Sequence, residues 1–348
     1  LPSCRRRSRG TQPWIQVPVL CAVLVSMKTI GVLGTFVWDE IWHPALGPAQ
    51  PLTQWGGLTY SLSAFGAADP SGTLIHPLAR VGSDLADAAF RFVSQLPCIG
   101  STRGLKVVDE PNNRVELRYQ DHADRLERLT GGVAGWELDD LLPLVGQLDA
   151  LYLNFLAGNE LDLSTAVALR AAVDIPIYAD LHSLFLGPPG DGARQPRRLD
   201  DWECWLSCFD IVQMNETELG LLGSARPDPF ALLPDLPGFG PKIVLITRGA
   251  GGATAAVRTG GTGIRSDGET QNEVQIIHFP LGELVDGDPT GCGDVWGSVC
   301  FCGLIEGRSL EAAVQRAHAA AGAKMKVREI NGITSAVATA LRPSSAPA

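Results

Sequence analysis

Short apolar runs alternate with helix-like stretches over the second half of the chain. The apolar runs occupy residues 150–155, 175–179, 208–213 and 243–247. A helix is expected between the first two runs, at 164–173, with Ser164 as its cap. Strands that alternate with helices form a parallel sheet covered on both faces, so the pattern predicts a doubly wound, mainly parallel α/β fold. Ligands of such sheets bind beyond the carboxyl ends of the strands.

Three further segments complete the expected outline. An apolar run at 29–33 predicts the first strand, and residues 310–327 have a strongly helical pattern. Between them, 104–119 alternates apolar and polar residues on either side of the turn-forming Pro111-Asn112-Asn113, which predicts a β-hairpin. The small residues and prolines of 337–348 predict a disordered tail.

Composition narrows the class of protein. The 348 residues, 45% of them hydrophobic, allow one large domain with an appendage or two domains, with a sizeable core. The net charge of −10 argues against a surface that binds nucleic acid. The eight cysteines include no C-x-x-C pair, and their scattered positions in a long chain favour reduced thiols and a cytoplasmic location.

The candidate chemistry is concentrated at residues 288–294, Asp-Pro-Thr-Gly-Cys-Gly-Asp, directly before an apolar helical stretch. Glycines let backbone N–H groups point at one spot, and a helix N-terminus adds partial positive charge there. An anion site results, with a carboxylate beside it that can take a proton from a hydroxyl during phosphoryl transfer. The alternative is a glycine-rich helix cap that happens to contain an aspartate.

This stretch resembles the C-terminal signature of the ribokinase-like (PfkB) carbohydrate and nucleoside kinases, usually D-T-x-G-A-G-D. Cys292 and Trp296 depart from the usual small residues. The resemblance implies that Asp294 is the catalytic base and that the amides of Gly291, Cys292 and Gly293 hold the transferred charge. It also implies ATP and Mg²⁺ as cofactors, with a monovalent cation as a further one.

Substrate residues are implied in the first half of the chain. Asp39, after the first strand, matches an aspartate that binds substrate hydroxyls in the family, although a surface-loop role is the alternative. Gly56, Gly57 and Ser61 match the family's G-G-x-x-x-N, with Ser61 in place of the asparagine. The resemblance also implies a small β-sheet lid over the substrate, built from about 40–60 and 104–120.

Polar residues that follow predicted strands are further candidates. Asn154 follows one strand and Asp180-Leu181-His182 another, and both can face substrate or cap loops. Asn215 and Glu218 match the family's N-x-x-E, in which the glutamate orders water around Mg²⁺ near the phosphates. The same spacing also fits a helix capping box, and the two roles are compatible.

The implied nucleotide site includes a glycine-rich loop. Thr247, Gly249 and Gly252 match the family's T-x-G-x-x-G along the nucleotide, although such loops are also common hairpin turns. His318, in the helical stretch 310–327, is a candidate wall of the adenine site, with simple packing as the alternative. The sequence has neither a P-loop nor a dinucleotide-binding glycine motif.

The N-terminal 26 residues can be interpreted in two ways. Arg5, Arg6, Arg7 and Arg9 precede an apolar run at 17–25, as in a secretory signal peptide, but the run is too short to span a membrane. We favour the alternative that residues 1–26 are an upstream extension, because the strand after Met27 is where the family's fold begins. The kinase domain is therefore expected at 27–336.

Together these observations predict an ATP-dependent phosphotransferase that acts on a hydroxymethyl group of a sugar or nucleoside. The expected partners are that small substrate and a second copy bound through the lid, with neither nucleic acid nor a membrane. A non-catalytic ligand-binding or regulatory protein on the same fold is the alternative, and the unusual Ser61, Cys292 and Trp296 motivate it.

Overall fold

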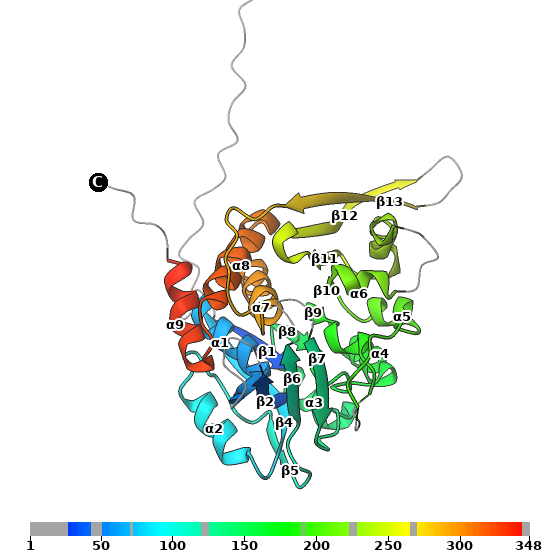
Figure 1. Ribbon diagram of the computed structural model, residues 1–348. Coiled ribbons are helices and arrows are strands. Elements are labelled where there is room, and N and C mark those ends of the chain that lie inside the picture. The colour runs from blue at the N-terminus through cyan, green and yellow to red at the C-terminus, as the bar shows by residue number, and fades with distance from the viewer. Residues whose placement is uncertain are drawn as a thin grey trace, which may run out of the picture.

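The computed structural model of the chain describes residues 27–42, 51–69, 72–119, 125–188, 190, 192–222, 228–264 and 270–342 (Figure 1). The expected extension at 1–26 lies outside the described residues, as do 343–348 of the expected tail. No helix within the described ranges is long and apolar enough to cross a membrane.

Within the part of the chain that the structure describes, the main sheet has nine strands, most of them parallel. Their order across the sheet is β13 (Thr270–Phe279), β12 (Ala253–Ile264), β11 (Ile243–Thr247), β10 (Ile211–Asn215), β9 (Ile177–Asp180), β8 (Ala150–Asn154), β1 (Lys28–Leu33), β4 (Thr73–Gly82) and β5 (Leu105–Val108). Neighbours from β5 to β11 pair in parallel, whereas β12 and β13 form an antiparallel edge.

Helices cover both faces of this sheet, as the alternation of strands and helices predicts (Figure 1). One face packs against α1 (Leu58–Ala68), α2 (Ala86–Ser94), α7 (Cys292–Ile305), α8 (Leu310–Met325) and α9 (Ile330–Ala340). The other packs against α3 (Leu138–Val145), α4 (Leu163–Ala172), α5 (Trp202–Ser207) and α6 (Glu216–Gly220). The predicted doubly wound, mainly parallel fold is confirmed.

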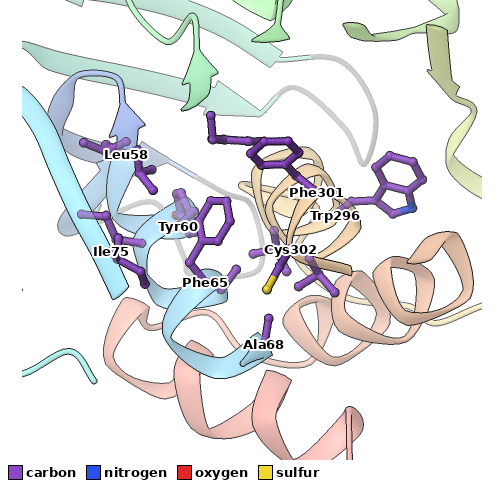
Figure 2. Close-up of a cluster of buried hydrophobic side chains, with 14 of the residues drawn as sticks. Leu58, Tyr60, Phe65, Ala68, Ile75, Trp296, Phe301 and Cys302 are labelled. Atoms are coloured by element: carbon purple, nitrogen blue, oxygen red, sulfur yellow. The ribbon is translucent and has the colours of Figure 1, made fainter. Parts of the chain in front are cut away.

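The side chains of a central strand show why the sheet needs two layers. Along β8, Tyr152 points into the core beneath α1 and α7, whereas its neighbours Leu151 and Leu153 point into the core beneath α4 and α5. Each such apolar side chain contributes about 1.5–3 kcal/mol when it is fully buried. Figure 2 shows Tyr60 and Phe65 of α1 facing α7 in the first of these cores.

Among the described residues, a second sheet of four strands lies beside the main one, close to the segments expected for the lid, and we call it the lid. Its order is β3 (Leu52–Gly57), β2 (Phe36–Trp42), β6 (Arg114–Tyr119) and β7 (Arg125–Thr130). The predicted hairpin at 104–119 is wrong, because β5 pairs in parallel with β4 in the main sheet and β6 pairs with β7. The lid therefore takes 114–119 and 125–130 from this region, and not the whole of 104–120.

Asn112 explains why the chain does not turn back at the expected hairpin. Its buried side-chain amide donates to the carbonyls of Phe36 and Asn113, and its oxygen accepts from the Gly82 amide at 3.1 Å. Gly82 ends β4 of the main sheet and Phe36 begins β2 of the lid. Asn112 thus fastens the chain where it crosses from one sheet to the other.

Two predicted boundaries are also wrong. Helix α9 continues to Ala340 with Val337 fully buried, so the expected disorder does not begin at residue 337. The small residues that suggested a tail instead let α9 pack closely on α1 and α8. Helix α4 is capped by Asp162, which accepts from the Thr165 amide at 2.6 Å, rather than by Ser164.

Candidate functional site

Four neighbouring strands end in polar residues at the same edge of the sheet. Asn154, Asp180, Asn215 and Thr247 are the last residues of β8, β9, β10 and β11. Asn154 is in register with Asp180, and Asn215 is in register with Thr247. Asp180, however, is in register with Gln213, two residues before Asn215. The four strand ends therefore form a staggered row along this edge, although they lie far apart in the sequence.

A cavity of about 270 Å³ opens in front of this row. Its walls come from three places: the strand ends, the 288–294 turn and the inner face of the lid. The lid side and the residues next to it include Asp39, Gly57, Tyr60, Val115, Leu117 and Glu127. A pocket with convergent polar groups at the carboxyl ends of parallel strands is the expected location of a binding site in this type of fold.

The 288–294 turn enters the cavity through a left-handed glycine. Gly291 has φ 76° and precedes α7, and a Cβ at this position would lie 2.5 Å from the Tyr60 ring. Gly293 is exposed and lines the cavity. As the second residue of α7, Gly293 has an N–H that no carbonyl of the helix can accept. The Cys292 amide, in contrast, already donates to the Pro289 carbonyl at 3.1 Å.

The Cys292 side chain does not line the cavity. Burial raises the pKa of the thiol from 9.0 to about 12. Its Sγ makes long contacts with the Asp288 and Ala321 carbonyls, at 3.7 and 3.8 Å. A thiol with such a pKa stays protonated at neutral pH and is a poor nucleophile.

Asp294 lies in the first turn of α7, and its half-buried side chain lines the cavity. The Asn154 amide donates to its Oδ1 at 2.6 Å. The same amide lies 3.3 Å from Ser61 Oγ, and both Asn154 and Ser61 are fully buried. Asn154 and Ser61 therefore lie behind the predicted base and hold it, a position from which Ser61 does not line the cavity.

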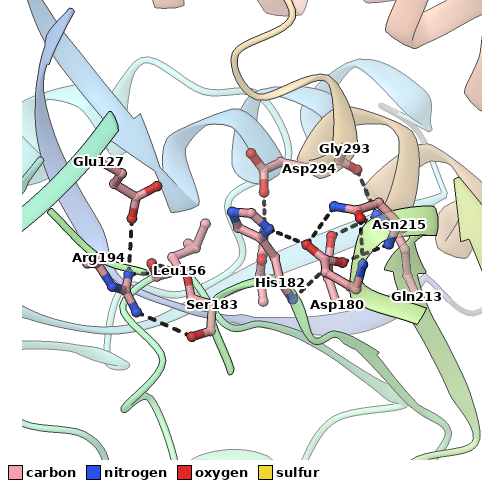
Figure 3. Close-up of polar contacts among 12 residues, drawn as sticks. Glu127, Leu156, Asp180, His182, Ser183, Arg194, Gln213, Asn215, Gly293 and Asp294 are labelled. Carbon is pink, nitrogen blue, oxygen red and sulfur yellow. Dashed lines mark hydrogen bonds and ion pairs between the residues drawn. The ribbon is translucent and has the colours of Figure 1, made fainter. Parts of the chain in front are cut away.

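Glu218 is both a helix cap and a wall of the cavity. The Asn215 side chain accepts from the Glu218 amide, and the Glu218 carboxylate accepts from the Asn215 amide at 2.7 Å, which is a capping box. Glu218 Oε1 also lies 2.6 Å from His182 Nδ1. In Figure 3 the His182 ring and the Asp294 carboxylate point toward each other.

This arrangement fits a magnesium ion that is held mainly by the phosphates of a bound substrate and less by protein side chains. No group of three or more acidic, histidine or cysteine side chains in the described ranges could hold a metal by itself. Mg²⁺ usually keeps several waters and binds through one or two carboxylates together with substrate phosphates. Glu218, whose carboxylate faces the cavity, fits the role of ordering such waters.

Asp180 is the most buried of the three acids near His182. Its side chain is 4% exposed, and burial raises the pKa of its carboxyl from 3.8 to about 8, with a further rise from the charges of Glu218 and Asp294. Gln213 Nε2 donates to Asp180 Oδ2 at 2.7 Å. Asp180 is therefore mostly protonated at neutral pH, which limits the negative charge that collects around the cavity.

The paired glycines of the lid lie next to Asp39 and leave room for its side chain. A Cβ at Gly56 would lie 1.8 Å from Asp39 Oδ2, so only glycine lets this carboxylate lie against the neighbouring strand. Gly57, with φ 56°, lines the cavity beside Asp39 and ends β3 at the start of α1. Two of the predicted substrate residues, Asp39 and Gly57, thus line one wall of the cavity, and Gly56 packs against Asp39.

The glycine-rich loop and His318 lie away from this cavity. Gly249 and Gly252, at φ 50° and 77°, form the tight turn between β11 and β12, in which Arg248 N donates to the Gly252 carbonyl. Of the loop, Thr247 lines the cavity. His318 Nδ1 accepts from Trp296 Nε1 at 3.1 Å, and its Nε2 lies 3.3 Å from the Phe279 carbonyl.

Sequence reasoning missed several residues around the cavity. The Tyr119 hydroxyl of the lid lies 2.6 Å from the Thr290 hydroxyl of the 288–294 turn. Arg194, with a nearly buried side chain, pairs with Glu127 of the lid at 3.0 Å. Gln213 could have been found, because it is a polar residue at the end of the mostly apolar 208–213 run. Tyr119 and Arg194 had no such signal, because their partners are distant in the sequence.

A monovalent cation does not fit beside the turn. Such an ion needs oxygen ligands, and Asp288 at the start of the turn offers a carboxylate and a carbonyl. Both are bonded to the ammonium of Lys324, at 3.2 and 3.0 Å. The oxygens are therefore already held by a cation that belongs to the chain.

Comparisons with known proteins agree with this geometry. The model of the pfkB family carbohydrate kinases matches residues 191–335, which include the 288–294 turn. No curated protein matches the sequence. Ribokinase from Thermotoga maritima superposes with a TM-score of 0.67 at 17% identity, covering 90% of this chain and 99% of its own.

Two other solved structures show the same likeness. Arabidopsis thaliana ribokinase, complexed with ribose and ATP, has a TM-score of 0.62 at 18% identity and covers 92% of this chain and 100% of its own. A pyrophosphate-dependent kinase of the ribokinase family, complexed with a pyrophosphate analogue and myo-inositol, has a TM-score of 0.63 at 19% identity, with coverages of 87% and 96%. The chain therefore has the ribokinase fold, and its residues 191–335 match the model of the pfkB family carbohydrate kinases.

Proposed function

We propose that this protein is an ATP-dependent phosphotransferase that phosphorylates a hydroxymethyl group of a sugar or nucleoside. One observation carries the proposal: Asp294 and the Gly293 backbone share one cavity with the strand ends and the lid. This places a carboxylate beside a helix N-terminus, where a transferring phosphoryl group and an acceptor hydroxyl can meet.

In this proposal Asp294 takes the proton from the acceptor hydroxyl. Asn154, which donates to Asp294 Oδ1 at 2.6 Å, fixes the orientation of the carboxylate. The Gly293 N–H and the α7 dipole stabilise the charge that develops on the transferred group. Glu218 would order the waters around a bound Mg²⁺, and the ion would neutralise charge on the donor phosphates.

The lid side of the cavity suits a polyhydroxylated acceptor. Asp39 and Glu127 provide carboxylates that can accept hydroxyl hydrogen bonds, and Val115 and Leu117 provide apolar surface for carbon–hydrogen faces. A covering sheet also excludes water, which would otherwise compete as the phosphoryl acceptor. These features support a sugar or nucleoside rather than a simple alcohol.

The test begins with ADP release from ATP against a panel of sugars, nucleosides and inositols, with pyrophosphate as the second donor. Pyrophosphate is included because a protein with the same fold uses it. Turnover with ATP and one class of acceptor is the expected result. Tight binding of ligands without any turnover would instead support the non-catalytic binding protein.

The Asp294→Asn variant then tests the base. Asparagine keeps the size of the side chain but cannot accept the proton, so we expect kcat to fall at least ~10²-fold. Nucleotide affinity should survive, because the Gly293 amide and the α7 N-terminus remain. Cys292→Ala should be nearly silent, because its thiol makes only the long contacts described above. A fully active Asp294→Asn enzyme would contradict the mechanism.

A further inference from the structure

A fully buried lysine lies beneath the 288–294 turn. Lys324, in the last turn of α8, has a side-chain exposure of 0%. Its Nζ donates to the carbonyl of Asp288 at 3.0 Å and to its carboxylate at 3.2 Å. Nζ also lies 5.6 Å from the centre of the Tyr60 ring, the ring that contacts Gly291. Burying an ammonium is costly unless it is paired, so the fold maintains a positive charge at this point.

The surroundings of Lys324 favour a cation for a second reason. The C-terminal end of α8 contacts the turn directly, because the Met325 carbonyl accepts from the Asp288 amide at 2.9 Å. The C-terminus of a helix carries partial negative charge. This helix end, the Asp288 carboxylate and the Asp288 carbonyl together form a small pocket of negative potential, and Nζ lies in it.

We propose that Lys324 is a positioning residue that supplies from within the chain the positive charge that a bound monovalent cation would supply beneath the 288–294 turn. Asp288 transmits its effect, because Asp288 Oδ1 accepts from the Thr290 amide at 3.0 Å. The ammonium neutralises Asp288 and thereby holds the turn that presents Gly293 to the cavity. The consequence for turnover rests on the proposed kinase function, whereas the consequences for stability and for nucleotide affinity do not.

The first experiment compares the unmodified protein in potassium, sodium and choline chloride at equal ionic strength. Thermal unfolding, ADP affinity by calorimetry and turnover of the best acceptor are measured in each salt. We expect all three to be the same, because the ammonium cannot exchange with the medium. A clear rise in Tm, in ADP affinity or in kcat with potassium would overturn the proposal.

Variants then remove the charge with and without a cavity. Lys324→Met keeps most of the side-chain volume but leaves Asp288 unpaired, so we expect Tm to fall by about 5–10 °C and kcat by at least ~10-fold in every salt. Lys324→Ala leaves space beside the Asp288 oxygens. Potassium or ammonium chloride should therefore restore part of its Tm and kcat, and choline should not.

Lys326→Met is the matched control, because Lys326 is an exposed lysine two residues further along. It should match the unmodified protein in all measurements. Equal kcat for Lys324→Met and the unmodified protein would reduce Lys324 to a stabilising residue and overturn the proposal. A protein that turns over no acceptor contradicts the proposed function alone, because the Tm and ADP measurements still decide the role of Lys324.

Discussion

The acidic residues around the cavity differ in how deeply they are buried, and therefore in how readily they lose a proton. Asp180 lies deepest, with a carboxyl pKa raised to about 8 by burial and by two neighbouring carboxylates, whereas Asp294 is half-buried and faces the cavity. One of three neighbouring acids therefore keeps its proton at neutral pH. In the proposed kinase, bound phosphates would therefore meet the charges of two carboxylates and not of three.

This raised pKa makes stability depend on pH in a defined direction. Between pH 3.8 and about 8 the folded protein holds a proton on Asp180 that the unfolded chain has lost. The free energy of unfolding should therefore fall as pH rises through this window, by an amount on the order of a few kcal/mol. Denaturant unfolding of the unmodified protein and of Asp180→Asn at several pH values measures the effect.

In the Asp180→Asn variant, the free energy of unfolding should not show this fall with pH. Asparagine does not titrate, and it keeps an oxygen that accepts the hydrogen bond from Gln213. Groups far from Asp180 titrate in the same way in both proteins, so the difference between the two curves reports on Asp180 together with the carboxylates coupled to it. Parallel curves for the two proteins would contradict the raised pKa.

At the residue scale, the sequence identified cavity residues that belong to a local motif. It missed residues whose contact partners are distant in the sequence. Asp294, Gly293, Glu218 and Asp39 all line the cavity, as the motifs imply. Ser61 was expected to contact substrate but lies behind the base, since full burial against Asn154 leaves it no access. Only folding reveals that Lys324, in an alanine-rich helix, meets Asp288.

At the scale of single elements, the start of α7 depends on one backbone conformation. Gly291 has φ 76°, and any side chain there would meet the Tyr60 ring. Left-handed backbone is disfavoured for residues with a Cβ, and the contact adds a steric penalty. The anion site and the aromatic core beneath it therefore share this glycine.

Gly291→Ala should consequently destabilise the protein by roughly 2–4 kcal/mol, from backbone strain and overpacking together. Gly220→Ala is the control, because a Cβ at Gly220, in α6, meets no atom within 4 Å. The control should change stability by less than about 1 kcal/mol. Denaturant midpoints of both variants decide the matter, and equal midpoints would show that the turn adapts.

The elements themselves were predictable where apolar periodicity was strong. The central strands and both helical layers follow from it. The hairpin at 104–119 was wrong because alternation identifies strands but not their partners, and Asn112 directs the chain into a different sheet. The boundary at 337 was wrong because small residues suit both disordered tails and closely packed helices.

At the scale of the whole molecule, a buried ion pair joins the lid to the loop that follows β9. Arg194 donates to Glu127 of β7 and to the carbonyls of Ala157 and Gly187. Its side chain is 1% exposed, and that of Glu127 is 12% exposed. Removing one partner of a buried pair leaves the other charge poorly compensated.

Arg194→Met should therefore lower the free energy of unfolding by about 3–5 kcal/mol. Arg197→Met, three residues away and exposed, should cost less than about 1 kcal/mol. Urea unfolding of the two variants provides the comparison. A small effect for Arg194→Met would mean that the lid is held to the main sheet mainly by its other contacts, such as that between Tyr119 and Thr290.

Strand β3 passes into helix α1 without a loop, because Gly57 ends the strand and Leu58 begins the helix. An edge strand of the lid and the helix that carries Tyr60 against Gly291 are thus one continuous segment of the chain. In the proposed kinase, an acceptor that displaces the lid would therefore also move the Tyr60 ring next to Gly291. A water molecule is too small to displace the lid in this way. We therefore expect hydrolysis of the phosphate donor to remain slow in the absence of an acceptor substrate.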